Sequence, residues 1–129
     1  MKTEKPTTKI IAGKYKGKIL ELPSLDVTRS SRARLKESLF NVLQFDIIDK
    51  IFIESFAGSG SIGLEAISRG AKRAYFVELD RNSYQILLKN CKAVDMEKCQ
   101  TVQGNTFVQT PLFINFLKNS QDEIVLYID

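Results

Sequence analysis

Apolar residues occur in this chain in two alternating patterns, short continuous runs and stripes with helical spacing. Continuous runs are typical of strands buried on both faces of a sheet, whereas apolar residues three and four positions apart are typical of amphipathic helices. The runs predict strands over 51–54, 74–79, 100–103 and 123–129. The stripes predict helices that begin at Arg32 and cover 61–69, 81–94 and 107–119, with Pro111 in the first turn of the last one.

The segment before the first helix has a different pattern. Strand-like runs over 9–13 and 18–22 are separated by a loop with a glycine at each end, which predicts a β-hairpin. Its tip would carry Lys14, Tyr15 and Lys16, where an aromatic ring can stack on a base while ammonium groups meet phosphates. An exposed hairpin tip is also often polar without any ligand. Residues 24–31 are predicted to be a loop, with Ser31 as the N-cap of the first helix.

The order of hairpin, helix and then alternating strands and helices predicts an α/β fold. Such alternation produces a mostly parallel sheet with right-handed crossovers. Counted from the strand at 51–54, the expected strand order is 3-2-1-4, a Rossmann-like arrangement. The carboxyl ends of the first and fourth strands then meet at the topological switch point, with Glu54, Gly58 and Asp129 around one crevice.

A glycine turn follows the first strand of this sheet. Gly58, Gly60 and Gly63 have G-x-G-x-x-G spacing, which allows the backbone to pass close to a bound molecule, although the spacing alone is also found in dinucleotide-binding proteins and in turns that merely pack tightly. Glu54 lies four residues before the first glycine. A carboxylate there repels a pyrophosphate but attracts an amine, which favours S-adenosylmethionine over a dinucleotide.

Two further polar residues follow the next strands. Glu78 ends the second strand, where a carboxylate can accept hydrogen bonds from both ribose hydroxyls of a nucleotide on the first loop. Asp80 is expected to cap the helix over 81–94. Asn105 follows the third strand and either reads the adenine edge or serves as an ordinary turn residue.

Composition limits the classes of protein that remain. The chain has 129 residues, of which 43% are hydrophobic, and this is enough for one domain with a single core. The polar N-terminus and the lack of a long apolar run predict no membrane contact and a cytoplasmic location. Because the chain has no histidine, Ser-His-Asp and Cys-His pairs are excluded and no metal site is expected. Cys91 and Cys99 have neither redox nor zinc spacing and are expected to be reduced core residues.

The positive charge is concentrated at the N-terminus. Residues 1–50 carry eleven Lys and Arg against six Asp and Glu, whereas residues 51–129 carry eight against nine. A phosphate-facing arm explains this distribution, and a solvated lysine-rich terminus is the alternative. We therefore divide the single domain into a basic hairpin arm over 1–31 and a cofactor-binding core over 32–129. The expected contacts to nucleic acid are Lys14, Tyr15, Lys16, Arg29, Arg32 and Arg34.

Four segments together resemble the bacterial 16S ribosomal RNA (guanine-N2) methyltransferases. Residues 9–18 resemble the opening hairpin of that family, and 28–41 resemble its "TRPT..R.RE.LFN" segment. Residues 56–71 are similar to "FAGSG.LGLEALSRGA", and 77–80 are similar to "VE.D". With the residues discussed above, the expected contacts to S-adenosylmethionine are Glu54, Phe56, Ala57, Gly58, Ser59, Gly60, Gly63, Glu78, Leu79, Asn105 and Thr106.

The resemblance implies a methyltransferase that acts on the N2 amine of a guanine in small-subunit ribosomal RNA or in an assembly particle of that subunit. It also implies that Asp129 is catalytic, as the first residue of an Asp-Pro-Pro-Tyr/Phe motif whose remainder is absent, so that binding without transfer is expected from residues 1–129. Three alternatives stay open: a DNA adenine-N6 methyltransferase, a nicotinamide-dependent oxidoreductase and a non-catalytic nucleotide-binding module.

Overall fold

The computed structural model describes residues 6–23 and 29–128, and for residues 29–33 it describes the backbone alone. The elements in chain order are β1 (Thr7–Lys9), β2 (Ile19–Glu21), α1 (Arg29–Leu43), β3 (Ile51–Glu54), α2 (Ser61–Ser68), β4 (Arg73–Glu78), α3 (Arg81–Val94), the 3-10 turn η1 (Met96–Lys98), β5 (Cys99–Gln103), α4 (Thr106–Leu117) and β6 (Ile124–Tyr127). Among the described residues, no helix is long and apolar enough to cross a membrane.

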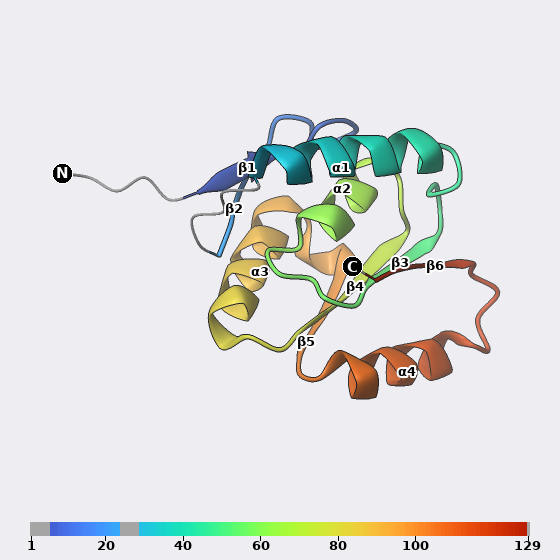
Figure 1. Ribbon diagram of the computed structural model, residues 1–129. Helices are drawn as coiled ribbons and strands as arrows, with labels where there is room; N and C mark the ends of the chain where they lie inside the picture. Colours follow the sequence, from blue (N-terminus) through green and yellow to red (C-terminus); the bar gives the residue numbers. More distant parts are fainter. Residues whose placement is uncertain (1–5, 24–28, 129) are drawn as a thin grey trace.

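Four strands form a parallel sheet in the order β5-β4-β3-β6, which confirms the predicted order 3-2-1-4 (Figure 1). The central strand β3 pairs with β4 on one side and β6 on the other, so that Glu54 lies between Phe76 and Tyr127 in the register. The helices α1, α2 and α3 lie on one side of the sheet and α4 lies on the other (Figure 1). The first and fourth sheet strands therefore end side by side, as the fold class requires.

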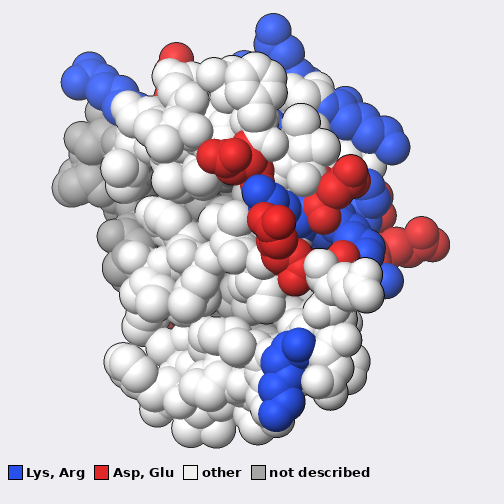
Figure 2. All heavy atoms as spheres, turned by 90° about the vertical axis from the view of Figure 1, so that its right-hand side faces the viewer, with Lys and Arg blue, Asp and Glu red and all other residues white. Residues whose placement is uncertain are grey.

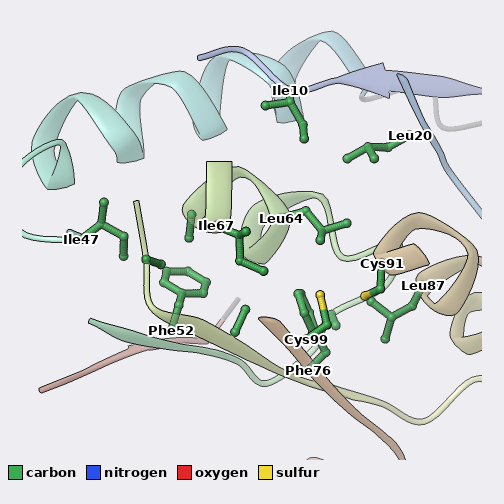
Figure 3. Close-up of a cluster of buried hydrophobic side chains, with 14 of the residues drawn as sticks. Ile10, Leu20, Ile47, Phe52, Leu64, Ile67, Phe76, Leu87, Cys91 and Cys99 are labelled. Atoms are coloured by element: carbon green, nitrogen blue, oxygen red, sulfur yellow. The ribbon is translucent and has the colours of Figure 1, made fainter. Parts of the chain in front are cut away.

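Residues of β3 alternate between two hydrophobic cores because successive side chains of a strand point to opposite faces. Phe52 belongs to the larger core, together with Phe76 of β4 and side chains from α1, α2 and α3. Figure 3 shows labelled residues from β3, β4, α2, α3 and the N-terminal segment pointing into one common space. Ile51 and Ile53 belong to the smaller core, with Leu117 of α4. Burial on both faces explains why β3 is an uninterrupted apolar run up to Glu54.

The N-terminal segment is tied to the first helix that follows the glycine turn. Glu65 of α2 is fully buried and accepts hydrogen bonds from the backbone N–H groups of Ile11 (2.9 Å) and Ala12 (3.1 Å). Ser68 donates its hydroxyl to the Ala12 carbonyl at 2.6 Å. Gly13 has a φ of 92°, and a Cβ at this position would lie 2.0 Å from the Ser68 carbonyl oxygen. The hairpin therefore packs closely against α2.

Several predicted boundaries differ from the structure. The hairpin strands pair over Thr7–Lys9 and Ile19–Glu21, because the hydrogen bonds to α2 draw residues 11–15 out of strand geometry. The helix α1 starts at Arg29, so the loop predicted up to residue 31 and the N-cap at Ser31 are wrong. Arginine is a strong helix former and serine an intermediate one, so nothing in this stretch prevents an earlier start.

The proline of α4 is also placed differently from the prediction. The helix begins at Thr106, which puts Pro111 in the second turn and not in the first. A proline there removes the hydrogen bond to the carbonyl four residues earlier, that of Phe107. Because Phe107 is highly exposed, water can solvate this carbonyl group. Inside the same helix, the hydroxyl groups of Thr106 and Thr110 are 2.6 Å apart and form a buried hydrogen bond.

The helix α3 matches its prediction at both ends. Asp80 is its N-cap, and its carboxylate accepts a hydrogen bond from the Ser83 N–H at 2.9 Å, which lowers the pKa of Asp80. Cys91 of this helix and Cys99 of β5 are free and buried, as predicted. The pKa of the Cys91 thiol is raised by its interaction with Cys99 and by burial, so the thiol stays protonated.

Candidate functional site

The glycine turn connects the end of β3 to the start of α2. Gly58 and Gly60 have φ values of 54° and 82°, in the left-handed region that glycine adopts without strain. A Cβ at Gly58 would meet nothing within 4 Å, whereas a Cβ at Gly60 would lie 2.4 Å from Leu87 and one at Gly63 would lie 2.3 Å from Phe76. Only Gly58 therefore presents its backbone to open space. The other two glycines allow α2 to pack closely on α3 and β4.

Two carboxylates flank this turn. Glu54 ends β3, is buried, and accepts a hydrogen bond from the Gly63 N–H at 3.0 Å. Glu78 ends β4, and its two oxygens accept hydrogen bonds from the N–H groups of Gly58 (2.7 Å) and Asp80 (2.9 Å). The N–H group of Gly63 belongs to the first turn of α2, where the helix dipole stabilises a negative charge. The sheet edge and the helix start thus hold both carboxylates in fixed positions.

Two cavities open along this edge, and both have Phe56 and Glu78 in their walls. The larger one has a volume of about 250 Å³, and the smaller one has a volume of about 180 Å³. The larger is lined by Thr8, Leu22, Leu35, Lys36, Glu54, Phe56, Ala57, Gly58, Ser59, Ser61, Ile62, Glu78 and Tyr127. The smaller is lined by Ser55, Phe56, Val77, Glu78, Leu79, Gly104, Asn105, Thr106 and Phe107.

Most of the residues predicted to contact a cofactor line one of these cavities. Glu54, Ala57, Gly58 and Ser59 lie in the larger one, and Leu79, Asn105 and Thr106 lie in the smaller one. Phe56 and Glu78 line both. Gly60 and Gly63 line neither, since their missing side chains make room for Leu87 and Phe76. Asp129 lies outside the described residues, and so do the side chains of Arg29 and Arg32.

Asn105 is the residue for which the sequence left two interpretations open, an adenine contact or a turn residue. It is the N-cap of α4, and its side-chain oxygen accepts a hydrogen bond from the Phe107 N–H at 2.8 Å. It is also part of the wall of the smaller cavity. The capping bond uses the amide oxygen, while the amide nitrogen carries donors that suit a ring nitrogen of adenine.

Sequence reasoning missed the contribution of the N-terminal segment to the larger cavity. Thr8 of β1, Leu22 and two residues of α1, Leu35 and Lys36, form part of its wall. A helical lysine is normally exposed. The Lys36 ammonium is instead buried and donates to the Lys9 carbonyl at 3.0 Å. The sequence signal that could have revealed the burial of Lys36 is its position one helical turn before Phe40, which is fully buried.

Lys36 belongs to a buried group of charges. Its Nζ lies 3.4 Å from Oε1 of Glu65, whose other oxygen accepts from Nε of Arg69 at 2.8 Å. Burial lowers the pKa of Lys36, and the carboxylates of Glu65 and Glu54 act in the opposite direction. The described residues contain no cluster of three His, Cys, Asp or Glu side chains suited to a metal ion.

The residues predicted to contact nucleic acid do not form a free hairpin tip. Lys14, Lys16 and Arg34 are exposed. Tyr15 packs against the larger core, and its hydroxyl lies 3.3 Å from a carboxylate oxygen of Asp95. The Lys14 ammonium lies over the Tyr15 ring, 5.4 Å from its centroid. The side chain of Tyr15 thus has structural partners, whereas Lys14 and Lys16 remain exposed.

The edge of the sheet at which the strands begin, opposite the cavities, carries paired charges. Lys50 pairs with Glu123 at 3.1 Å, and Lys72 pairs with Asp122 at 2.8 Å, beside the starts of β3, β4 and β6. Figure 2, which views the molecule from this side, shows red and blue side chains gathered together above a largely uncharged surface. Because these charges are paired, this edge presents no uniform field to a charged ligand. The cavities lie at the other ends of the strands.

Comparison with known proteins gives close relatives. A model of the family described as Conserved hypothetical protein 95 matches residues 8–129. The ribosomal RNA small subunit methyltransferase D of Haemophilus influenzae is 38% identical over 119 residues, which cover 92% of this chain and 59% of that protein. The Escherichia coli protein of the same name is 38% identical over 97 residues, which cover 75% of this chain and 49% of that protein. The chain thus spans about half to three fifths of the length of these relatives.

Solved structures share the fold. The structure of Escherichia coli yhhF has a TM-score of 0.70 and 37% identity, covering 78% of this chain and 54% of that one. An RNA methyltransferase from Salinibacter ruber, solved with S-adenosyl-L-homocysteine, has a TM-score of 0.53 and 19% identity, covering 58% of this chain and 49% of that one. The predicted fold class, a Rossmann-like methyltransferase fold with an N-terminal hairpin, is confirmed.

Proposed function

We propose that this chain, which belongs to the family described as Conserved hypothetical protein 95, binds S-adenosylmethionine in the two neighbouring cavities and serves methyl transfer to a base amine of small-subunit ribosomal RNA. The observation that carries the proposal is the position of Glu54. Its carboxylate accepts the N–H of Gly63 at the start of α2, where a dinucleotide-binding protein places a pyrophosphate. A buried negative charge there suits the ammonium group of an amino acid and opposes a phosphate.

The other cavity residues match the remaining parts of the cofactor. Glu78 is held by two backbone N–H groups, and a carboxylate has acceptor capacity left for ribose hydroxyls. Leu79, Asn105 and Phe107 line the smaller cavity, which offers apolar contacts and one amide to an adenine ring. The relatives named as ribosomal RNA methyltransferases support the use of S-adenosylmethionine.

The finer part of the proposal is the acceptor, the exocyclic N2 amine of a guanine. When bound, S-adenosylmethionine supplies a methyl group on a sulfonium that an amine attacks in line, with the thioether leaving. The task of the chain is to hold the amine on that axis, since its lone pair is delocalised into the ring. By resemblance we assign to Asp129 the hydrogen bond that localises this lone pair. The base reaches the cavity only when it is unpaired or flipped out.

A transfer assay tests the proposed function. The protein that carries this chain is incubated with methyl-labelled S-adenosylmethionine and either unmodified small ribosomal subunits or duplex DNA, and the nucleosides are then analysed. We expect label in N2-methylguanosine from the subunits. Label in N6-methyladenine of DNA would overturn the acceptor assignment but not the cofactor. Binding of a nicotinamide dinucleotide with no binding of S-adenosylmethionine, measured by calorimetry, would overturn both.

A further inference from the structure

The larger cavity contains two buried side chains of opposite charge. Glu54 is 3% exposed and Lys36 is 2% exposed, and both line the cavity. They come from different parts of the fold, Glu54 from the end of β3 and Lys36 from α1. Buried charges are uncommon unless they are paired or meet a charged ligand. A buried carboxylate and a buried ammonium in one cavity suit the zwitterionic end of an amino acid.

We propose that Lys36 binds the carboxylate of the methionine part of S-adenosylmethionine, while Glu54 binds its ammonium group. This inference rests on the proposed function, because it takes the cavity to be the cofactor site. It assigns to α1 a direct part in cofactor binding, in addition to its part in the core. The basic N-terminal region then has one cation that serves the cofactor and not the nucleic acid.

Glu65 does not require the positive charge of Lys36. Its two carboxylate oxygens already accept three hydrogen bonds at 2.8–3.1 Å, from Ile11, Ala12 and Arg69. The Lys36 ammonium is farther away, at 3.4 Å. Arg69 also neutralises the charge of Glu65, so the positive charge of Lys36 is not needed for that purpose. Glu65 holds the ammonium in place and leaves its charge available to the cavity.

The donors of Lys36 lead to the same conclusion. An ammonium group carries three hydrogens, and two acceptors are found for it among the described residues, the Lys9 carbonyl at 3.0 Å and Glu65. A ligand carboxylate is a suitable third acceptor, because hydrogen bonds between charged groups are the stronger ones. The charged side chains in the described lining are Lys36, Glu54 and Glu78, which is one more carboxylate than ammonium. S-adenosylmethionine fits this excess, because its sulfonium adds one positive charge to its zwitterionic end.

A set of ligands that differ at one end tests the role of Lys36. Binding of S-adenosylmethionine and of its decarboxylated form is measured by calorimetry for the parent protein, Lys36→Met and Lys36→Arg. We expect Lys36→Met to lower the affinity for S-adenosylmethionine by about 10- to 100-fold. Its affinity for the decarboxylated form should stay within about twofold of that of the parent protein. Lys36→Arg keeps the charge and should retain most of the affinity, since a guanidinium also binds a carboxylate.

Lys50→Met is the matched control, because Lys50 lies at the opposite edge of the sheet and pairs with Glu123. It should change neither affinity. If Lys36→Met lowered the affinity for both ligands equally, Lys36 would have a purely structural role and the inference would be overturned. Unchanged binding of S-adenosylmethionine by Lys36→Met would also overturn it. If the parent bound neither ligand, the proposed function would fall together with the inference. Thermal unfolding of each variant shows whether the fold is retained, and the ratio of the two affinities does not depend on the fraction folded.

Discussion

At the scale of single residues, Glu78 has a well-defined geometry. Both carboxylate oxygens are held by backbone N–H groups, at 2.7 Å and 2.9 Å, and the residue lines both cavities. Hydrogen bonds to charged groups contribute about 1.5–3 kcal/mol. We therefore expect Glu78→Ala to weaken S-adenosylmethionine binding by that amount, as measured by calorimetry.

Glu97→Ala is a suitable comparison, because Glu97 is an exposed carboxylate of η1 outside both cavities. Its substitution should leave the affinity unchanged. The unfolding temperature of Glu78→Ala is needed as well, since Glu78 also supports the turn at Gly58. Wild-type affinity in Glu78→Ala would contradict the assignment of the ribose to this residue.

At the scale of elements, Glu65 of α2 joins the N-terminal segment, α1 and α2. It accepts from the N–H groups of Ile11 and Ala12 and from Arg69, and it lies near Lys36. Removal of one partner of a buried ion pair leaves an uncompensated charge, at a cost of about 3–5 kcal/mol. We expect Glu65→Gln to lower the free energy of unfolding by about 3 kcal/mol in urea titrations. Amide exchange at residues 11–12 should accelerate more than exchange in β4.

Lys89→Gln is the control for this prediction. Lys89 pairs with Glu21 at 3.1 Å, also between the hairpin and a helix, but its side chain is 62% exposed. Exposed ion pairs contribute about 0–1 kcal/mol, so the loss should be small. Similar losses for the two variants would mean that burial of Glu65 does not stabilise the docked hairpin.

At the scale of the whole molecule, the excess of positive charge lies in residues 1–50. Lys14, Lys16 and Arg34 are exposed and line neither cavity. Each cation that neutralises a phosphate contributes about 0.7–0.9 to the slope of log affinity against log salt. We expect their joint substitution by Gln to weaken binding to ribosomal RNA and to lower that slope by about 2 to 3, while the affinity for S-adenosylmethionine is retained.

The matching triple variant replaces Lys50, Lys72 and Lys118, which precede β3 and β4 and follow α4. It removes the same charge from the other end of the sheet, where the lysines before the strands are already paired. Filter-binding titrations at several salt concentrations compare the two. An equal change of slope in both variants would mean that RNA binding follows net charge and not the N-terminal surface.

The sequence determined what depends on neighbours along the chain. The spacing of apolar residues located the strands and helices, and the alternation of strands with helices along the chain implied the strand order. Asp80 was identified as a cap because capping is a contact over three residues. Glu54 and Glu78 were placed at the ends of buried strands, and strands that are parallel end at the same edge. These inferences need no knowledge of distant contacts.

Only the tertiary structure decided which distant residues share a cavity. Thr8, Leu22 and Lys36 reach the larger cavity because Glu65 and Ser68 hold the N-terminal segment on α2, across more than fifty residues of sequence. The same docking gave Tyr15 a partner in Asp95. The patterns along a sequence show that a residue is suited to burial or to solvent, but not which partner covers it. A lysine in particular fits both environments, since its apolar stem packs while its ammonium finds an acceptor.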